Sequence, residues 1–172
     1  SEMCIRDSSA NCATFDSPWW GPIGYVDCDR VIYRRTPTPF EHFDPKTLSA
    51  RVDLIKAVTG SGREYIDFAV EQGIQGLVIE GFGRGNIPPG MINGIADAVA
   101  KGVAVVISTR TPGGRVLDVY GYAGSVTDSC KHGAIMGGEI SAAKARLKLI
   151  LALSEKPQLA KDLVALQAIF DI

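Results

Sequence analysis

The feature that most constrains the fold is a repeated alternation of short apolar runs with amphipathic segments that end at glycine. Two of the runs, around Leu77–Ile79 and Val103–Ile107, are continuous and rich in β-branched residues, which is typical of strands covered on both faces. A further strand is predicted at Val52–Val58, and a shorter candidate follows at Val119–Tyr122. The order strand, helix, strand, helix, strand favours right-handed crossovers, so we predict an α/β fold with a parallel sheet between two helical layers.

Helix-period patterns fill the intervals between these strands. Apolar residues in segments 66–70 and 92–99 recur at spacings of three and four, and the two segments end at Gly73 and Gly102, which suit the left-handed position after a helix. Ser141 is predicted to cap a helix that runs to about Leu153. Its last two turns are apolar on nearly all sides, so we expect deep packing. The three-layer arrangement that these elements predict is flavodoxin-like.

Beyond Pro157 a last helix is expected, with one apolar stripe that we assign to the core. The stripe consists of Leu159, Leu163, Leu166 and Phe170. At the other end of the chain, Gly24–Arg35 is predicted to form a short β-hairpin around an Asp27–Arg30 turn. Thr36–Pro45 contains three prolines and is interpreted as a linker.

Composition excludes several classes of partner. The 172 residues carry 18 basic and 19 acidic side chains, a net charge of -1, and no basic run, so we expect no nucleic-acid partner and no anionic membrane surface. No apolar stretch approaches the roughly 20 residues that a membrane span needs. The four cysteines include no C-x-x-C pair and there are two histidines, so we predict no metal site. Free thiols favour a reducing, cytoplasmic location.

Ligands of a parallel sheet bind at the carboxyl ends of its strands, which selects the loops at 59–62, 81–90 and 108–115. In the second loop, three glycines allow close backbone approach and Asn86 can both donate and accept hydrogen bonds. Pro88 and Pro89 then start a helix whose free N–H groups suit a carboxylate. Two other interpretations stay open: the glycines only form a tight turn, or they bind a dinucleotide although Asn86 replaces the third glycine of G-x-G-x-x-G.

Motifs for a catalytic nucleophile are missing from the sequence. There is no G-x-S-x-G, no paired-histidine metal motif, no P-loop and no cysteine with a convincing base. Ser108 and Thr109 are candidates only because they lie on the predicted rim of the site, as does Thr111. Arg110 and Arg115 suit a carboxylate, although solvated surface arginines are the commoner case. Trp19 and Trp20 form either an apolar surface for a covering domain or an exposed loop pair.

Four ordered segments resemble the bacterial-type L-asparaginase family, in the C-terminal domain. They are SPWWGPIGYVD (17–27), GIQGLVIEGFGRGNIPP (73–89), VAVVISTRTPGGRV (103–116) and GAIMGGEISAAKARLKLILAL (133–153). The opening residues SEMCIRDS resemble a translated sequencing adapter, so we expect residues 1–9 to be an artefactual or disordered tail and the gene to be truncated there. Residues 10–45 are then the end of an N-terminal domain with hairpin and linker, and residues 46–172 the C-terminal α/β domain.

The resemblance implies hydrolysis of L-asparagine to L-aspartate and ammonia by an enzyme that needs no metal or organic cofactor. In this family a threonine of the N-terminal domain is the nucleophile, and the C-terminal domain completes the pocket of a neighbouring subunit, usually in a homotetramer. The resemblance therefore implies no catalytic residue in this chain, which alone should be inactive. The family's substrate-contacting asparagine falls on Asn86, and we expect Gly85, Ser108 and Thr109 to line the same site. Some members add a glutamate from the segment after the S-S/T-R motif, but between Arg110 and Cys130 this sequence has no glutamate and its acidic residues are Asp118 and Asp128.

Two alternatives differ in function while sharing this fold. Asparaginase-like domains also occur in archaeal tRNA-dependent amidotransferase subunits, which release ammonia from glutamine. A non-enzymatic flavodoxin-like binding module is the other alternative, and it requires the backbone of Gly81–Asn86 to hold a phosphate.

Overall fold

The computed structural model describes residues 17, 20–36 and 41–171. The chain divides into two compact units, Ser1–Glu41 and His42–Ile172. The predictions for residues 1–9 and for Trp19 lie outside the described residues. The domain boundaries expected from the sequence stay predictions.

The first unit contains the predicted hairpin. Strands β1 (Gly24–Asp27) and β2 (Arg30–Tyr33) pair antiparallel with Asp27 opposite Arg30, which confirms the turn position. Cys28 takes a positive φ of 48° in this two-residue turn. Most of the hairpin side chains are exposed, so the two strands bury little apolar surface by themselves.

The second unit is built on a four-stranded sheet in the order β3-β4-β5-β6, and every pair of neighbours is parallel. The strands are β3 (Val52–Lys56), β4 (Gly76–Gly81), β5 (Ala104–Thr109) and β6 (Ile135–Met136). β5 is buried along its whole length, which explains its continuous apolar sequence. The predicted α/β class and parallel sheet are confirmed.

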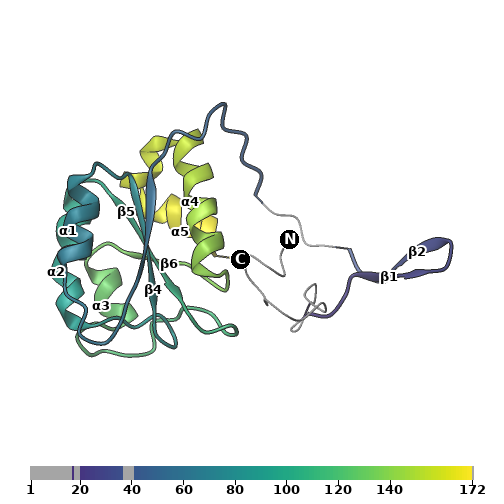
Figure 1. Ribbon diagram of the computed structural model, residues 1–172, viewed down its shortest axis with the longest axis horizontal. Helices are drawn as coiled ribbons and strands as arrows, with labels where there is room; N and C mark the ends of the chain where they lie inside the picture. The colour runs from purple at the N-terminus through teal and green to yellow at the C-terminus, as the bar shows by residue number, and fades with distance from the viewer. Residues whose placement is uncertain (1–16, 18–19, 37–40, 172) are drawn as a thin grey trace. The chain divides into compact units, whose positions relative to one another are not determined.

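Helices cover both faces of this sheet. On one face lie α1 (Glu64–Glu71), α2 (Ile92–Ala100) and α3 (Val126–Lys131), and a short 3₁₀ helix, η2 (Pro89–Met91), precedes α2. The other face is covered by α4 (Ala142–Glu155), the 3₁₀ helix η3 (Pro157–Lys161) and α5 (Leu163–Phe170), as Figure 1 shows. Because strand order follows chain order, right-handed crossovers put the connecting helices on one face, and α4 and α5 close the other.

Each face of the sheet has its own apolar core, because alternate strand residues point to opposite sides. In β4, Leu77 and Ile79 pack with α1 and α2, whereas Val78 packs with α4.

The residues at the helix ends adopt the conformations and the cap that the sequence predicts. Gly73 and Gly102 take positive φ values of 75° and 84° directly after α1 and α2. Ser141 caps α4 by accepting from the Lys144 N–H.

Three predictions were wrong in detail. Val119–Tyr122 forms no strand, because the edge beside β5 is occupied by Ile135–Met136 and the Val119 side chain is exposed. The last turns of α4 are not buried on all sides, since Leu147 is 57% exposed while Leu149 is fully buried. In the predicted core stripe, Leu163 at the start of α5 is exposed.

In the part of the chain that is described, no helix combines the length and apolarity that a membrane crossing requires.

Candidate functional site

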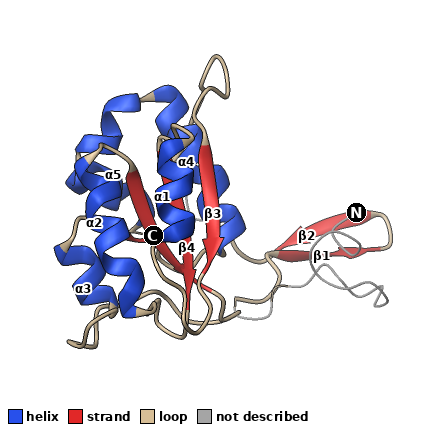
Figure 2. Ribbon diagram, turned by 60° about the vertical axis from the view of Figure 1, so that its left-hand side comes forward, coloured by secondary structure: helices blue, strands red, loops and turns tan. Residues whose placement is uncertain are grey.

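The carboxyl ends of β3, β4 and β5 bring the three predicted loops to one edge of the sheet. Figure 2 shows β3 and β4 running in the same direction, and their register places Lys56 opposite Glu80 at this end. β5 is also parallel to β4, with Thr109 opposite Gly81. The edge therefore gathers the loops after Lys56, Gly81 and Thr109, which is where parallel α/β folds bind ligands.

The glycine-rich loop after β4 folds into a tight turn that presents Asn86. Phe82 and Asn86 exchange backbone hydrogen bonds of 2.8 and 3.0 Å, and the Gly85 N–H also donates to the Phe82 carbonyl at 2.7 Å. A Cβ at Gly81 would lie 2.6 Å from the Asn86 carbonyl oxygen, and one at Gly85 (φ 107°) would meet Val116 at 2.9 Å. Side chains are thus excluded from both positions by close packing.

This turn uses up most of the N–H groups that a phosphate would need. The N–H groups of Phe82, Gly85 and Asn86 bond within the turn, and that of Ile87 donates to the Gly124 carbonyl. The two prolines that follow have no N–H, and the Met91 N–H donates to Pro88. The geometry therefore disfavours the phosphate-cradle alternative and leaves the start of η2 with few donors for a carboxylate.

The threonines after β5 hold the glycine loop. The Thr109 hydroxyl donates to the Gly83 carbonyl at 2.6 Å and lies 3.1 Å from the Thr111 hydroxyl, which is itself 3.3 Å from the same carbonyl. Ser108 points to the opposite face, fully buried, where its hydroxyl donates to the Ile140 carbonyl at 3.2 Å. Gly85, Ser108 and Thr109 thus have structural partners within this domain, and their contact with substrate stays a prediction.

Arg110 joins the ends of three strands. Its guanidinium donates to the carbonyls of Ala57 and Gly81, and it stacks 4.4 Å from the ring centroid of Phe82. The side chain is therefore committed to the scaffold, unlike the carboxylate-binding role considered from sequence. Arg115 is exposed, and its carbonyl accepts from Arg84 at 3.3 Å.

A second backbone junction brings the segment after Tyr120 to the glycine loop. The Ile87 N–H donates to the Gly124 carbonyl at 2.8 Å. Gly124 has a φ of 87°, and a Cβ there would lie 2.2 Å from the Ile87 carbonyl oxygen. The Gly124 N–H donates to the Asp128 carboxylate at 2.9 Å, so this acidic residue secures the junction. Neither Asp118 nor Asp128 is among the residues that line the two hollows described next.

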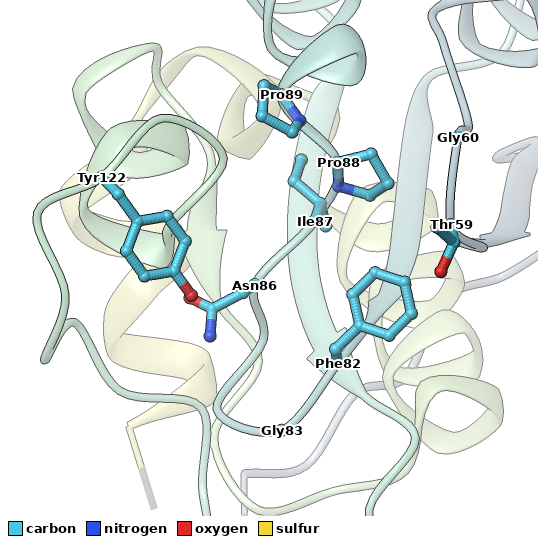
Figure 3. A pocket seen from close by; sticks show the side chains of 9 residues that line it. All are labelled: Thr59, Gly60, Phe82, Gly83, Asn86, Ile87, Pro88, Pro89 and Tyr122. Atoms are coloured by element: carbon cyan, nitrogen blue, oxygen red, sulfur yellow. The ribbon is translucent and has the colours of Figure 1, made fainter.

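Two adjoining hollows lie along this edge, and Asn86 lines both. The first has a volume of about 410 Å³ and is shown in Figure 3; its walls come from the first two loops together with Tyr122. The second, of about 310 Å³, is lined by the glycine loop, by Thr111, by residues 113–115 and by Tyr120. The Asn86 Oδ1 atom is buried and accepts no hydrogen bond from the described residues. Both volumes fall in or near the roughly 300–1,000 Å³ range of small-molecule sites.

Asn86 lines the first hollow together with Thr59, Phe82 and Tyr122, and its contact with substrate stays a prediction. Thr59 belongs to a loop that the sheet rule had selected, but Tyr122 was assigned to a strand and missed as a site residue. A G-Y-x-G pattern precedes α3, yet the need for glycine at 124 appears only when the Ile87 carbonyl is seen beside it.

The chain is thus an α/β domain with a small-molecule pocket at the carboxyl edge of its sheet. The pocket is mostly apolar and has one amide side chain, that of Asn86, in its lining. Residues 51–170 match the model of the glutaminase/asparaginase C-terminal domain, and the chain belongs to that family. The relationship predicted from the four sequence segments is confirmed.

The curated relatives include L-asparaginases and a subunit of an amidotransferase. The chain is similar to the L-asparaginase of Bacillus licheniformis, at 36% identity over 155 residues, or 90% of this chain and 48% of that protein. It is 40% identical to the probable L-asparaginase of Deinococcus radiodurans over 138 residues, or 78% and 42%. A glutamyl-tRNA(Gln) amidotransferase subunit of Pyrococcus abyssi is 39% identical over 100 residues, or 58% and 23%. The chain thus spans about half the length of the L-asparaginases that it matches.

Proposed function

We propose that this chain is the C-terminal domain of an L-asparaginase that hydrolyses asparagine to aspartate and ammonia. In this proposal the Asn86 pocket forms one part of an active site. The nucleophilic threonine of that site belongs to the N-terminal domain of a neighbouring subunit. The complete protein would be a cytoplasmic homotetramer without metal or organic cofactor. Sedimentation of the complete protein and cell fractionation test the assembly and the location.

The observation that carries the proposal is the position of Asn86 between the two hollows, on a turn that packing holds in one shape. The NH2 group of a primary amide can donate to a substrate carboxylate. The first hollow contains the hydroxyls of Thr59 and Tyr122 but no histidine, lysine or carboxylate to act as base. This supports a division of labour in which Asn86 binds substrate and the reacting groups come from elsewhere.

Exposed apolar side chains in and beside the hairpin support the proposal of an N-terminal domain that covers them. Val26 in β1 is 74% exposed, Tyr33 in β2 is 71% exposed, and the preceding Trp20 is 74% exposed. A two-stranded hairpin is marginal by itself in water and needs an apolar surface to pack against. The proposed N-terminal domain would provide that surface, in agreement with the first interpretation of Trp20.

The proposal is tested by comparing the 172-residue chain with the complete protein in an ammonia-release assay. We expect no turnover of asparagine by the chain alone, because the attacking hydroxyl is not in it, and turnover by the complete protein. Turnover by the pure 172-residue chain would show that the nucleophile has been misplaced. An inactive but folded complete protein would refute the proposed reaction.

Asn86→Ala in the complete protein tests the proposed substrate contact. Losing a hydrogen bond to a charged group costs about 1.5–3 kcal/mol, so kcat/KM for asparagine should fall about 10- to 100-fold. Asn93→Ala is a matched control, because Asn93 is exposed on α2 and lines neither hollow. If the two variants have the same kcat/KM for asparagine, Asn86 does not contact the substrate.

A second candidate function is favoured by the similarity to the amidotransferase subunit of Pyrococcus abyssi. In that case the complete protein would release ammonia from glutamine for use on a tRNA-bound substrate. Assays with asparagine and glutamine, each with and without tRNA, separate the two functions. Glutamine hydrolysis that depends on tRNA would favour the amidotransferase.

A further inference from the structure

Tyr122 lines the first hollow together with Asn86. Figure 3 shows the two side chains pointing toward one another, and both line the pocket. Tyr122 is 53% exposed, so its position depends on the local backbone and not on burial in the core. Its ring packs against Tyr120 with centroids 5.6 Å apart and an interplanar angle of 33°. Since Tyr120 lines the second hollow, the two rings stand beside both spaces that Asn86 borders.

The backbone around Tyr122 is fixed to the loop that carries Asn86. The Ser125 N–H donates to the Tyr122 carbonyl at 3.0 Å, and two residues after Tyr122 the Gly124 carbonyl accepts from Ile87, the residue after Asn86. Ser125 also caps α3 by accepting from the Asp128 N–H at 3.2 Å. One backbone junction therefore sets the separation between the phenol and the amide.

The Asn86 amide is incompletely satisfied. Its Oδ1 atom is buried and accepts no hydrogen bond from the described residues, although a buried carbonyl without a donor is costly. Among the residues that line the first hollow, Thr59 and Tyr122 carry hydroxyl groups, and Tyr122 is the one that points toward Asn86. The structure therefore offers a donor and an unpaired acceptor in the lining of one pocket.

We propose that Tyr122 is a positioning residue, whose hydroxyl donates to Asn86 Oδ1 when the pocket is occupied. Because the oxygen and nitrogen of a planar amide point in different directions, this bond would turn the Asn86 amino group toward the substrate carboxylate. Neither Asp118 nor Asp128 lines the hollow, so the segment after β5 contributes a neutral phenol and not an acidic group to this pocket. The proposal rests on the asparaginase function proposed above.

Tyr122→Phe in the complete protein tests this role, because it removes the hydroxyl and keeps the ring. We expect KM for asparagine to rise about 3- to 10-fold with kcat unchanged, since the bond orients a group that binds the ground state and the transition state equally. The melting temperature should stay that of the wild type, because the residue is half exposed. Tyr65→Phe is the matched control, since Tyr65 is 72% exposed on α1 and lines neither hollow.

A double-mutant cycle with Asn86→Ala shows whether Tyr122 acts through Asn86. We expect Tyr122→Phe to have no further effect once the Asn86 amide is gone. A wild-type KM for Tyr122→Phe, or additive effects of the two substitutions, would overturn the proposal. A lower kcat with unchanged KM would also overturn it, because that result indicates loss of folded enzyme. These outcomes require an active wild type, so an inactive wild type refutes the proposed function instead.

Discussion

Gly124→Ala tests the backbone junction on which the shape of the pocket depends. In the structure Gly124 combines a φ of 87° with a Cβ direction that ends 2.2 Å from the Ile87 carbonyl oxygen. A non-glycine residue in the left-handed region costs about 1–2 kcal/mol. The clash also breaks the bond from the Ile87 N–H, and Ile87 is only 4% exposed, which adds about 1–3 kcal/mol for an unpaired buried donor.

Together these effects lower the free energy of unfolding by about 2–5 kcal/mol, which corresponds to a fall in melting temperature of roughly 10 °C. Thermal unfolding of the 172-residue chain followed by circular dichroism measures this change. Alanine substitutions at two other glycines, Gly114 and Gly121, separate the cost of the positive φ from the cost of the clash. Gly114 has a φ of 88° with nothing within 4 Å of its Cβ direction, so Gly114→Ala isolates the conformational cost of about 1–2 kcal/mol.

Gly121 has neither constraint, and Gly121→Ala should change stability by less than about 0.5 kcal/mol. The expected order of melting temperatures is therefore Gly121→Ala highest, Gly114→Ala intermediate and Gly124→Ala lowest. If Gly124→Ala and Gly114→Ala have the same melting temperature, the close approach to Ile87 contributes nothing to the loss of stability, and the reasoning about the junction is refuted.

Two further predictions concern the core and the thiols. Leu149→Ala should lower the free energy of unfolding by about 2–5 kcal/mol in urea, whereas Leu147→Ala on the exposed face of α4 should change it by less than about 0.5 kcal/mol; similar values would contradict the observed packing of α4. Burial, with a smaller contribution from the negative charge of Asp118, raises the pKa of the Cys130 thiol to about 11. Its reactive thiolate is therefore scarce below that pH, and iodoacetamide at pH 8 should label exposed Cys28 before Cys130 in peptide maps.

The local sequence determined most of the secondary structure, because each signal acts within a few residues. Continuous β-branched runs predicted β4 and β5, and Gly73 and Gly102 predicted where α1 and α2 end. Parallel strands have to be connected by crossovers, so the same pattern was enough to place Asn86 at the carboxyl edge of the sheet.

Only the tertiary structure decided which segment occupies the sheet edge and what faces Asn86. Val119–Tyr122 has strand-forming residues, but strand formation needs a free neighbour, and Ile135–Met136 takes the place beside β5. Tyr122 reaches the pocket because the backbones of Ile87 and Gly124, far apart in the chain, approach to hydrogen-bonding distance. Such an approach depends on packing between distant segments, which no local pattern of residue types encodes.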